Sequence, residues 1–220
     1  MRIIALISIL TFISCSHNSH NHGHANKVMN QKVFEKLVEA FESPERESYQ
    51  KPNLIIASMG NIKDKQIIDI GAGTGYFSMR MAKKGAVVTH ADVDQRFLDY
   101  AEKRAKELKL SQNLIVKKVP YDSPLMGQSQ YDYAIIVNTY HHIEERVEYF
   151  RKVKEGLKPN GTLIIVDFKK PAAPSEPAKF PSVEMRISTQ QIQEELAQAG
   201  FMQFKVDNNM LPYQYVIKAN

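Results

Sequence analysis

Residues 67–77 read IIDIGAGTGYF and carry the strongest structural signal in this 220-residue chain. An apolar run typical of a buried strand ends at Ile70, and Gly71, Gly73 and Gly75 follow before a helical pattern begins. Glycine tolerates positive φ angles and lets a ligand approach the backbone closely. The N-terminus of the helix beyond offers N–H groups and a partial positive charge, which suit an anionic group. The segment therefore predicts a strand, a ligand-binding turn and a helix in succession.

The spacing of the glycines narrows the kind of ligand. A dinucleotide fingerprint reads G-x-G-x-x-G, whereas this turn reads G-x-G-x-G and has Tyr76 in the place of the third glycine. The sequence also lacks a phosphate-loop lysine signature. Asp92 ends the next strand pattern, 17 residues after Gly75, where a carboxylate can accept hydrogen bonds from both ribose hydroxyls of a nucleoside. The pattern thus disfavours a nicotinamide oxidoreductase.

Strand and helix patterns alternate along most of the chain. Strand patterns cover residues 66–70, 86–91, 114–119, 133–137 and 162–166. Helical patterns cover residues 33–41, 52–59, 76–84, 95–108, 146–157 and 188–199. Such alternation predicts an α/β fold, in which helices cover both faces of a mostly parallel sheet. The last strand patterns, 201–206 and 213–217, have no helix between them and are predicted to pair antiparallel.

The composition is that of a globular protein, with 43% hydrophobic and 24% charged residues. The formal net charge of +5 comes from scattered lysine doublets, without a long basic block or a basic and aromatic array. We therefore expect no nucleic-acid partner. Cys15 is the single cysteine, so an internal disulfide framework is excluded.

Residues 1–15 predict an export signal. Arg2 precedes an apolar run over residues 3–13, which is too short to cross a bilayer, because a mature spanning helix needs about 20 residues. The run has the length of the apolar region of a signal peptide, and Cys15 follows it at once. This arrangement resembles a bacterial lipoprotein signal, which implies lipidation of Cys15 and a lipoprotein anchored to a cell-envelope membrane on its periplasmic side. An uncleaved anchor and ordinary signal cleavage are the alternatives.

Residues 16–28 predict a flexible linker rich in histidine. A polar tract of this kind cannot bury enough apolar area to offset the entropy of ordering it. Closely spaced imidazoles can capture a transition metal, but the tract has no cysteine or carboxylate to complete a defined site. We therefore predict no metal centre, with weak metal binding as the alternative, and one domain over residues 29–220.

The segments after the glycine turn complete a known pattern. They include YDSPL at residues 121–125, YDYAIIVNTYHHI at 131–143 and LKPNGTLIIVDF at 157–168. With D-x-G-x-G-x-G beginning at Asp69, this series resembles the class I S-adenosylmethionine-dependent methyltransferases over roughly residues 34–219. The resemblance implies a Rossmann-like sheet of seven strands with an antiparallel last strand, and N-terminal helices over the cofactor cleft. The motifs ERESYQKP (45–52) and LPYQY (211–215) resemble a subgroup of small, often exported methyltransferases.

The resemblance implies S-adenosyl-L-methionine as the cofactor and assigns its parts to strand ends. The methionine moiety is expected at Asp69 and the glycine turn, the ribose at Asp92, and the adenine at Val93. Asp122 is expected near the adenine edge, although the family's usual acidic residue stands a few positions earlier, where this chain has Val119 and Pro120. The expected cofactor-binding residues are Asp69, Gly71, Gly73, Gly75, Asp92, Val93, Asp122, Asn138 and Thr139.

Tyr140 and His141 are the expected catalytic residues, because they follow the strand end that lies beside the sulfonium. A histidine at this place suits general-base catalysis. The alternative is that His141 or His142 only packs or bonds to the backbone. Arg186, beyond a proline-rich loop, either meets an acidic substrate or forms a surface ion pair.

The predicted reaction transfers a methyl group from the sulfonium to an O, N, S or C nucleophile of an unidentified acceptor. The acceptor is expected to be a small molecule or a component of the cell envelope. Because the methyl group is already activated, the protein mainly has to align the reactants and exclude water. A lipid-anchored, non-catalytic protein that binds S-adenosylmethionine or a metal is the competing hypothesis, because the cofactor is made in the cytoplasm and the signal points outward.

Overall fold

A computed structural model describes residues 33–172, 176–177 and 180–220. The predicted export signal with Cys15 and the linker 16–28 lie outside the described residues, as do the first four residues of the predicted domain. Within the described ranges, no helix combines the length and the apolar character that crossing a bilayer requires.

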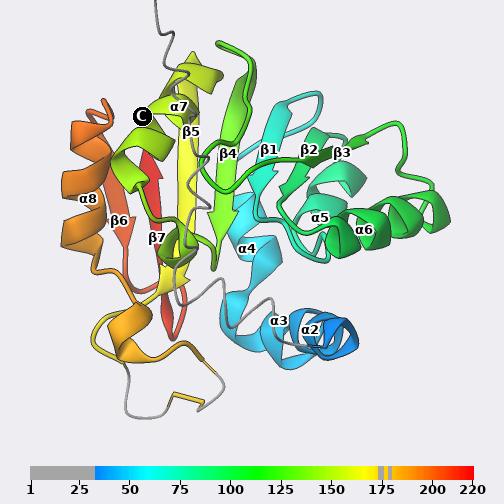
Figure 1. The fold of residues 1–220 in the computed structure, drawn as a ribbon, viewed down its shortest axis with the longest axis horizontal. Helices are drawn as coiled ribbons and strands as arrows, with labels where there is room; N and C mark the ends of the chain where they lie inside the picture. Colours follow the sequence, from blue (N-terminus) through cyan, green and yellow to red (C-terminus); the bar gives the residue numbers. More distant parts are fainter. Residues whose placement is uncertain (1–32, 173–175, 178–179) are drawn as a thin grey trace, which may run out of the picture.

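The described residues form a seven-stranded sheet (Figure 1). Its strands are β1 (Gln66–Ile70), β2 (Val87–Asp92), β3 (Leu114–Lys118), β4 (Tyr131–Val137), β5 (Leu157–Phe168), β6 (Phe204–Asp207) and β7 (Gln214–Ala219). They lie in the order β3-β2-β1-β4-β5-β7-β6. The first five strands pair in parallel, and β7 is antiparallel to both β5 and β6. The predicted Rossmann-like α/β class and the antiparallel last strand are confirmed.

Neighbouring residues of the central strands pack into two separate cores, because successive side chains of a strand point to opposite faces of the sheet. Ile68 of β1 joins the core under α7 (Arg146–Gly156) and α8 (Thr189–Gln198). Ile67 joins the other core, under α4 (Pro52–Ala57), α5 (Ser78–Lys83) and α6 (Gln95–Glu107). Helices therefore cover both faces, as the alternating pattern predicts.

The starts of two helices follow the local capping rules. Asp94 precedes α6, and its carboxylate accepts a hydrogen bond from the backbone N–H of Arg96 at 2.9 Å. Ser188 precedes α8, and its hydroxyl accepts from the N–H of Gln191 at 3.2 Å. Each cap stands directly before the first residue of its helix.

β5 is longer than the predicted strand over residues 162–166. It begins at Leu157 and includes the turn sequence Pro159-Asn160-Gly161. The pairing with β4 jumps from Leu157 opposite Tyr131 to Thr162 opposite Tyr133. The turn residues thus bulge out of the ladder while the residues on both sides of them stay paired.

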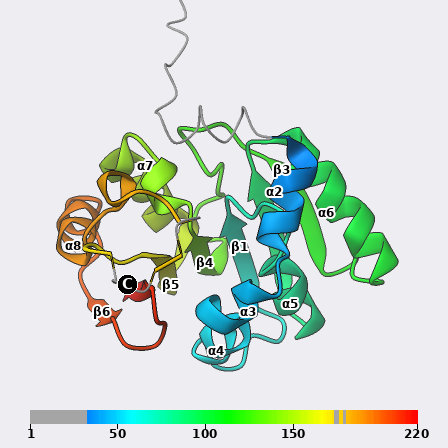
Figure 2. The ribbon, with the colours of Figure 1, turned by 90° about the horizontal axis from the view of Figure 1, so that it is seen from below.

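The helices α2 (Phe34–Phe41) and α3 (Glu45–Gln50), here called the cap, lie across the carboxyl edge of the parallel strands (Figures 1 and 2). Phe34 and Phe41 of α2 pack on Phe97 of α6, with ring centroids 5.1 and 5.6 Å apart. Glu42 forms an ion pair with Arg104 of α6 at 2.6 Å. Aromatic packing and this ion pair together fix the cap on the β2–β3 side of the edge.

Candidate functional site

Polar residues from separate strands gather at the carboxyl edge of the sheet. Asp69 lies on β1, Asp92 ends β2, Asn138 follows β4 and Asp167 lies near the end of β5. Because β7 runs in the opposite direction, its first residue, Gln214, pairs with the last residue of β5 and reaches the same edge. The cap lies over this edge in the end-on view (Figure 2). Ligands of open α/β sheets bind at such an edge, where the strand order reverses.

The glycine turn packs between β4 and the cap. Its three glycines all have positive φ, between +55° and +79°. A Cβ atom on Gly71 would lie only 2.4 Å from Cγ2 of Thr139, directly after β4. A Cβ atom on Gly73 would instead lie 3.4 Å from the ring of Phe41 in the cap. Close packing against β4 therefore requires glycine at Gly71, whereas the backbone of Gly73 faces the cap.

Asp92 is oriented by backbone N–H groups. The N–H of Gly73 donates to Oδ2 at 2.8 Å, and the N–H of Asp94 donates to Oδ1 at 2.9 Å. Burial raises the pKa of the Asp92 carboxyl, while these N–H donors lower it. Each carboxylate oxygen can accept more than one hydrogen bond. The carboxylate is thus held in place and retains acceptor capacity for the hydroxyls of a ligand.

Asp69 belongs to a buried network that the sequence did not reveal. The hydroxyl of Ser78 donates to Asp69 at 2.6 Å and lies 3.1 Å from Nδ1 of His90. Burial raises the pKa of Asp69 to about 6, against the opposing effects of Ser78 and Arg46. Burial also lowers the pKa of His90 to about 4, so its imidazole is neutral at pH 7. The network supports the glycine turn from below, because a Cβ atom on Gly75 would lie 3.6 Å from the His90 ring.

A chain of buried side chains connects the cap to β7 and β4. Arg46 donates from Nε to Gln50 at 2.5 Å, and the Gln50 amide donates to Gln214 at 3.2 Å. The Gln214 amide in turn donates to Oδ1 of Asn138. Gln50 and Gln214 are fully buried. These four residues are here called the amide chain. They connect the motif ERESYQKP (45–52) to the motif LPYQY (211–215), the two motifs that resemble one methyltransferase subgroup.

Arg46 is also a buried cation. Its guanidinium carbon lies 4.2 Å from the centre of the Tyr76 ring, and NH1 donates to the carbonyl of Phe41 at 2.8 Å. Burial lowers the pKa of Arg46, and the opposing charges include that of Asp69. Among the residues that the structure describes, no carboxylate forms an ion pair with it. A buried charge is costly unless it is paired, so this position suits an anionic group of a ligand.

His141 and Asp167 form a buried pair on the β4–β5 side of the edge. Nδ1 of His141 lies 2.9 Å from both carboxylate oxygens, and both side chains are only 3% exposed. In the described part of the chain, Nε2 of His141 has no hydrogen-bond partner. The His142 ring lies 4.3 Å away, and burial, with His141 itself, lowers its pKa to about 4. The pair thus presents one imidazole nitrogen that can accept a proton.

Comparison with known proteins shows which family this part of the chain resembles. Residues 68–163 match the family described as "Methyltransferase domain". A demethylmenaquinone methyltransferase of Tropheryma whipplei is 25% identical over 154 residues, which cover 64% of this chain and 59% of that protein. A ubiquinone biosynthesis O-methyltransferase of Histophilus somni is 29% identical over 105 residues, covering 46% and 44%. The chain thus spans about half the length of these relatives.

The fold agrees with that assignment. An S-adenosylmethionine-dependent methyltransferase from Aquifex aeolicus superposes with a TM-score of 0.75 at 23% identity, over 86% of this chain and 98% of that one. At this identity, the likeness extends to the fold. The described residues contain no group of three or more His, Cys, Asp or Glu side chains arranged to hold a metal ion.

Tyr140 occupies the core under α7 and α8. It is fully buried, its hydroxyl donates to Glu195 of α8 at 2.5 Å, and its ring stacks on Phe150 of α7 at 4.9 Å. Arg146 binds the same carboxylate at 2.7 Å. These are the contacts of a residue that joins α7 to α8, and the expectation that Tyr140 borders the acceptor finds no support in them.

The residues expected near the adenine, and the neighbouring Val119, lie at different depths in the fold. Val93 is half-buried against the core under α7. Val119 is buried, and its N–H donates to the carbonyl of Asp92 at 3.1 Å, which places it beside the ribose-binding candidate. Asp122 is exposed in a turn, where its carbonyl accepts from Lys152 at 3.0 Å. Val93 and Val119 thus suit an apolar wall for the adenine. The exposed Asp122 is less well placed to bind the polar edge of the adenine.

Arg186 organises the loop between β5 and α8. It forms a buried ion pair with Glu176 at 2.6 Å and donates to the carbonyls of Pro181 and Lys169. An ion pair was one of the two alternatives for Arg186, but the pair is buried and does not lie on the surface, because Arg186 is only 4% exposed. With these donors engaged inside the loop, Arg186 acts as a structural residue.

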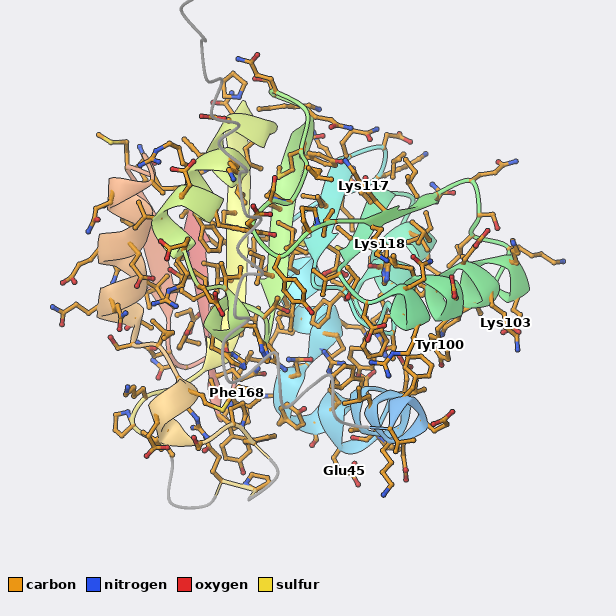
Figure 3. The ribbon with its side chains drawn as sticks, viewed as in Figure 1. Glu45, Tyr100, Lys103, Lys117, Lys118 and Phe168 are labelled. Atoms are coloured by element: carbon orange, nitrogen blue, oxygen red, sulfur yellow. The ribbon has the colours of Figure 1, made fainter. Side chains whose placement is uncertain are left out.

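Aromatic rings gather next to this loop, here called the ring cluster. Phe180 of the loop lies 4.7 Å from Phe168, 4.9 Å from Tyr49 of α3 and 5.5 Å from Tyr213, centroid to centroid. Figure 3 labels Phe168 at the end of β5 above the loop. The ring cluster thus joins the cap, the end of β5, the loop and the segment before β7.

Proposed function

We propose that this chain transfers the methyl group of S-adenosylmethionine to a small-molecule acceptor at the carboxyl edge of its sheet. The observation that carries the proposal is the methyltransferase domain over residues 68–163, which contains the glycine turn, Asp92 and Asn138. The names of the relatives, a demethylmenaquinone methyltransferase and a ubiquinone biosynthesis O-methyltransferase, favour a small molecule over a polymer of the cell envelope.

The residues at this edge match the polar parts of the cofactor. Arg46, a buried cation without a paired carboxylate in the described residues, would hold the carboxylate of the methionine end. Asp69, within Coulombic range of Arg46, would face the amino group, which would favour its ionised form. Asp92 would accept from the ribose hydroxyls, and Val93 and Val119 would contact the adenine. Bound S-adenosylmethionine supplies an activated methyl group, so the chain's own residues have to bind, orient and exclude water.

Calorimetry with the full chain tests the proposal. S-adenosylmethionine should bind and NAD should not. Asp92→Asn keeps the shape of the side chain but weakens its acceptors, and it should reduce the binding free energy by about 1–3 kcal/mol. Arg46→Met should reduce it by a similar amount, because the carboxylate loses its charged partner. Lys106→Ala is the matched control, since Lys106 is exposed and its ammonium pairs with Glu102 of its own helix.

The outcomes separate the hypotheses. A folded chain that fails to bind S-adenosylmethionine contradicts the proposal outright. A chain that binds the cofactor but never transfers labelled methyl to any component of a cell extract supports the competing, non-catalytic binding protein.

We further propose that the enzyme acts at the cell envelope, held by a lipid on Cys15. The support is the sequence of residues 1–15, with its apolar run ending at the single cysteine. The full chain should partition with membranes, and Cys15→Ala should accumulate as an unprocessed precursor. An intact mass of the mature protein without an acyl modification would overturn this part of the proposal.

A further inference from the structure

The amide chain has a direction, which is set by the buried cation at one end of it. We infer that Arg46 sets this direction and thereby orients the side-chain amide of Asn138, whose Nδ2–H group then donates to an oxygen lone pair of the acceptor. Gln50 and Gln214, which lie between them, are positioning residues. Because this role rests on the proposed methyl transfer, it narrows the class of acceptor for that reaction.

The direction of the amide chain starts at Arg46, because a guanidinium can donate hydrogen bonds but cannot accept them. Its Nε lies 2.5 Å from Gln50, so the group that Gln50 turns toward Arg46 has to be the amide oxygen. The two ends of an amide have nearly the same shape and are distinguished by the hydrogen bonds they make. Arg46 therefore decides the orientation of the first amide.

Each amide then decides the orientation of the next one. With its oxygen on Arg46, Gln50 turns Nε2 toward Gln214 and donates to the oxygen of that amide at 3.2 Å. Gln214 in turn donates from its own Nε2 to Oδ1 of Asn138. Gln50 and Gln214 are 0% exposed, so water cannot replace a bond that a reversed amide would lose. All three amides therefore point the same way, and one of them cannot reverse alone.

Asn138 is the open end of the amide chain. It follows β4 directly, has φ +56°, and its backbone N–H donates to the carbonyl of Val166 at 2.8 Å. The residue is half-buried, and within the ranges that the structure describes its side-chain Nδ2 has no hydrogen-bond partner. Successive hydrogen bonds polarise one another, so the cation at the far end strengthens the last donor. The amide chain thus leaves one N–H donor at the carboxyl edge of the sheet.

This donor suits the acceptor better than it suits the cofactor. In the proposed arrangement, Arg46, Asp69 and Asp92 are matched to the carboxylate, the amino group and the ribose of the cofactor. The part expected beside the end of β4 is the sulfonium, a cation, which an N–H donor does not attract. An oxygen that carries no hydrogen, as in a carbonyl, a carboxylate or an enolate, accepts such a bond, whereas an ammonium group is repelled. The acceptor is therefore expected to present such an oxygen beside the atom that is methylated.

A substitution that replaces one N–H₂ group of the amide chain by oxygen should reverse its open end. Gln50→Glu keeps an oxygen on Arg46 but presents a second oxygen to Gln214. The Gln214 amide then has to turn over, and that of Asn138 turns with it. NMR of the full chain without cofactor measures the outcome as hydrogen exchange of the Asn138 side-chain amide. The Nδ2 proton that faces Gln214 should exchange at least about tenfold more slowly in Gln50→Glu than in the wild type, because it is then hydrogen-bonded.

Three further variants separate this reversal from a loss of structure. Gln214→Glu presents an oxygen directly to Asn138, so it should give the same protection and repeats the test if Gln50→Glu does not fold. Gln50→Met breaks the amide chain without presenting an oxygen and should protect the Asn138 amide less, because both orientations are then populated. Gln203→Glu adds the same charge at an exposed position just before β6 and should leave the exchange unchanged. Equal exchange in Gln50→Glu and Gln50→Met would show that the amides have no fixed direction and would overturn the inference.

Acetate and methylammonium test the class of acceptor on the full chain saturated with S-adenosylhomocysteine, whose carboxylate would occupy Arg46. Acetate should move the Nδ2 proton signals of Asn138 downfield in the wild type, and methylammonium should not. In Gln50→Glu the affinity for acetate should fall by about tenfold or more, because an oxygen then stands at the open end. Asn138→Asp should lose acetate binding in the same way when it is followed at the backbone N–H of Thr139.

The outcomes of this titration distinguish the two proposals. If acetate causes no shift, or methylammonium causes an equal one, the assigned class of acceptor is overturned while the proposed methyl transfer stands. A folded chain that does not bind S-adenosylhomocysteine would overturn both.

Discussion

Replacing Gly71 by alanine measures how tightly the glycine turn packs on the end of β4. Gly71 has φ +67°, and its Cβ atom would lie 2.4, 2.6 and 3.0 Å from Cγ2, Oγ1 and Cβ of Thr139. The left-handed backbone costs an L-residue about 1–2 kcal/mol. Forcing a methyl group into a well-packed place costs about 1–3 kcal/mol more. Gly71→Ala should therefore lower the free energy of unfolding by about 2–5 kcal/mol.

Two further variants separate these contributions. Gly60 has φ +80° with no atom within 4 Å of its Cβ position, so Gly60→Ala should lose only the backbone part, about 1–2 kcal/mol. Thr139→Ala removes the two side-chain atoms nearest the new methyl and leaves only its Cβ at 3.0 Å. The double variant Gly71→Ala/Thr139→Ala should therefore regain most of the unfolding free energy that the clash removes. This gain should appear as a coupling energy of about 1–3 kcal/mol between the two substitutions.

Urea unfolding of the full chain, followed by circular dichroism at neutral pH, gives the required differences. The reasoning is refuted if Gly71→Ala is no more destabilising than Gly60→Ala. It is also refuted if the losses from Gly71→Ala and Thr139→Ala simply add, because the clash would then not lie between these residues.

Three other variants test the buried polar groups. The pKa of His90 is about 4 in the fold and 6.5 in its unperturbed state, so its contribution of about 3 kcal/mol is present above pH 6.5 and is lost as the pH falls toward 4. Asp69 affects the stability in the opposite direction over the same pH range, so the wild type alone does not isolate the effect of His90. The test is therefore urea unfolding of the wild type and of His90→Asn at several pH values. The difference between their unfolding free energies should shrink as the pH falls, and a difference that does not change with pH would disprove the assignment. Tyr140→Phe removes a buried hydroxyl from its carboxylate partner and should lower the unfolding free energy by about 1–3 kcal/mol, and an unchanged urea midpoint would show that the bond contributes nothing. Glu176→Gln leaves the buried Arg186 without its counter-charge and should cost roughly 3 kcal/mol in the same assay, whereas a loss near zero would place the loop in solvent.

The parts of the fold that depend on local chemistry could be predicted from the sequence. Asp94 and Ser188 cap helices through N–H groups two and three residues ahead, and such contacts need no knowledge of the tertiary structure. The glycine turn and the alternation of strands and helices are local in the same sense. β5 is longer than predicted because the turn sequence Pro159-Asn160-Gly161 forms a bulge within the strand. Whether such a turn ends the strand or bulges out of it depends on the pairing with β4, which the turn sequence does not determine.

The side-chain connections of the site could not be predicted in this way. Tyr140 and His141 are adjacent in sequence, but their side chains point in different directions. The Tyr140 hydroxyl reaches Glu195 of α8, whereas the His141 imidazole contacts Asp167, because both residues lie on a single turn of helix after β4. Asp167 could have been singled out by the rule that selected Asp92, since both are acidic residues at the ends of parallel strands. Arg46 gave no such signal, because an arginine in a short helix is usually exposed, and its burial depends on contacts with distant segments.

The amide chain has a consequence for exchanging parts between homologues. Gln50 and Gln214 are 164 positions apart, yet each satisfies the other's buried amide. A chimera that takes its N-terminal helices from one parent and its C-terminal hairpin from another would leave one of these amides without a partner, at a cost of about 1–3 kcal/mol. The cap and the C-terminal hairpin therefore behave as a single exchangeable module, and functional chimeras are expected only when both are replaced together.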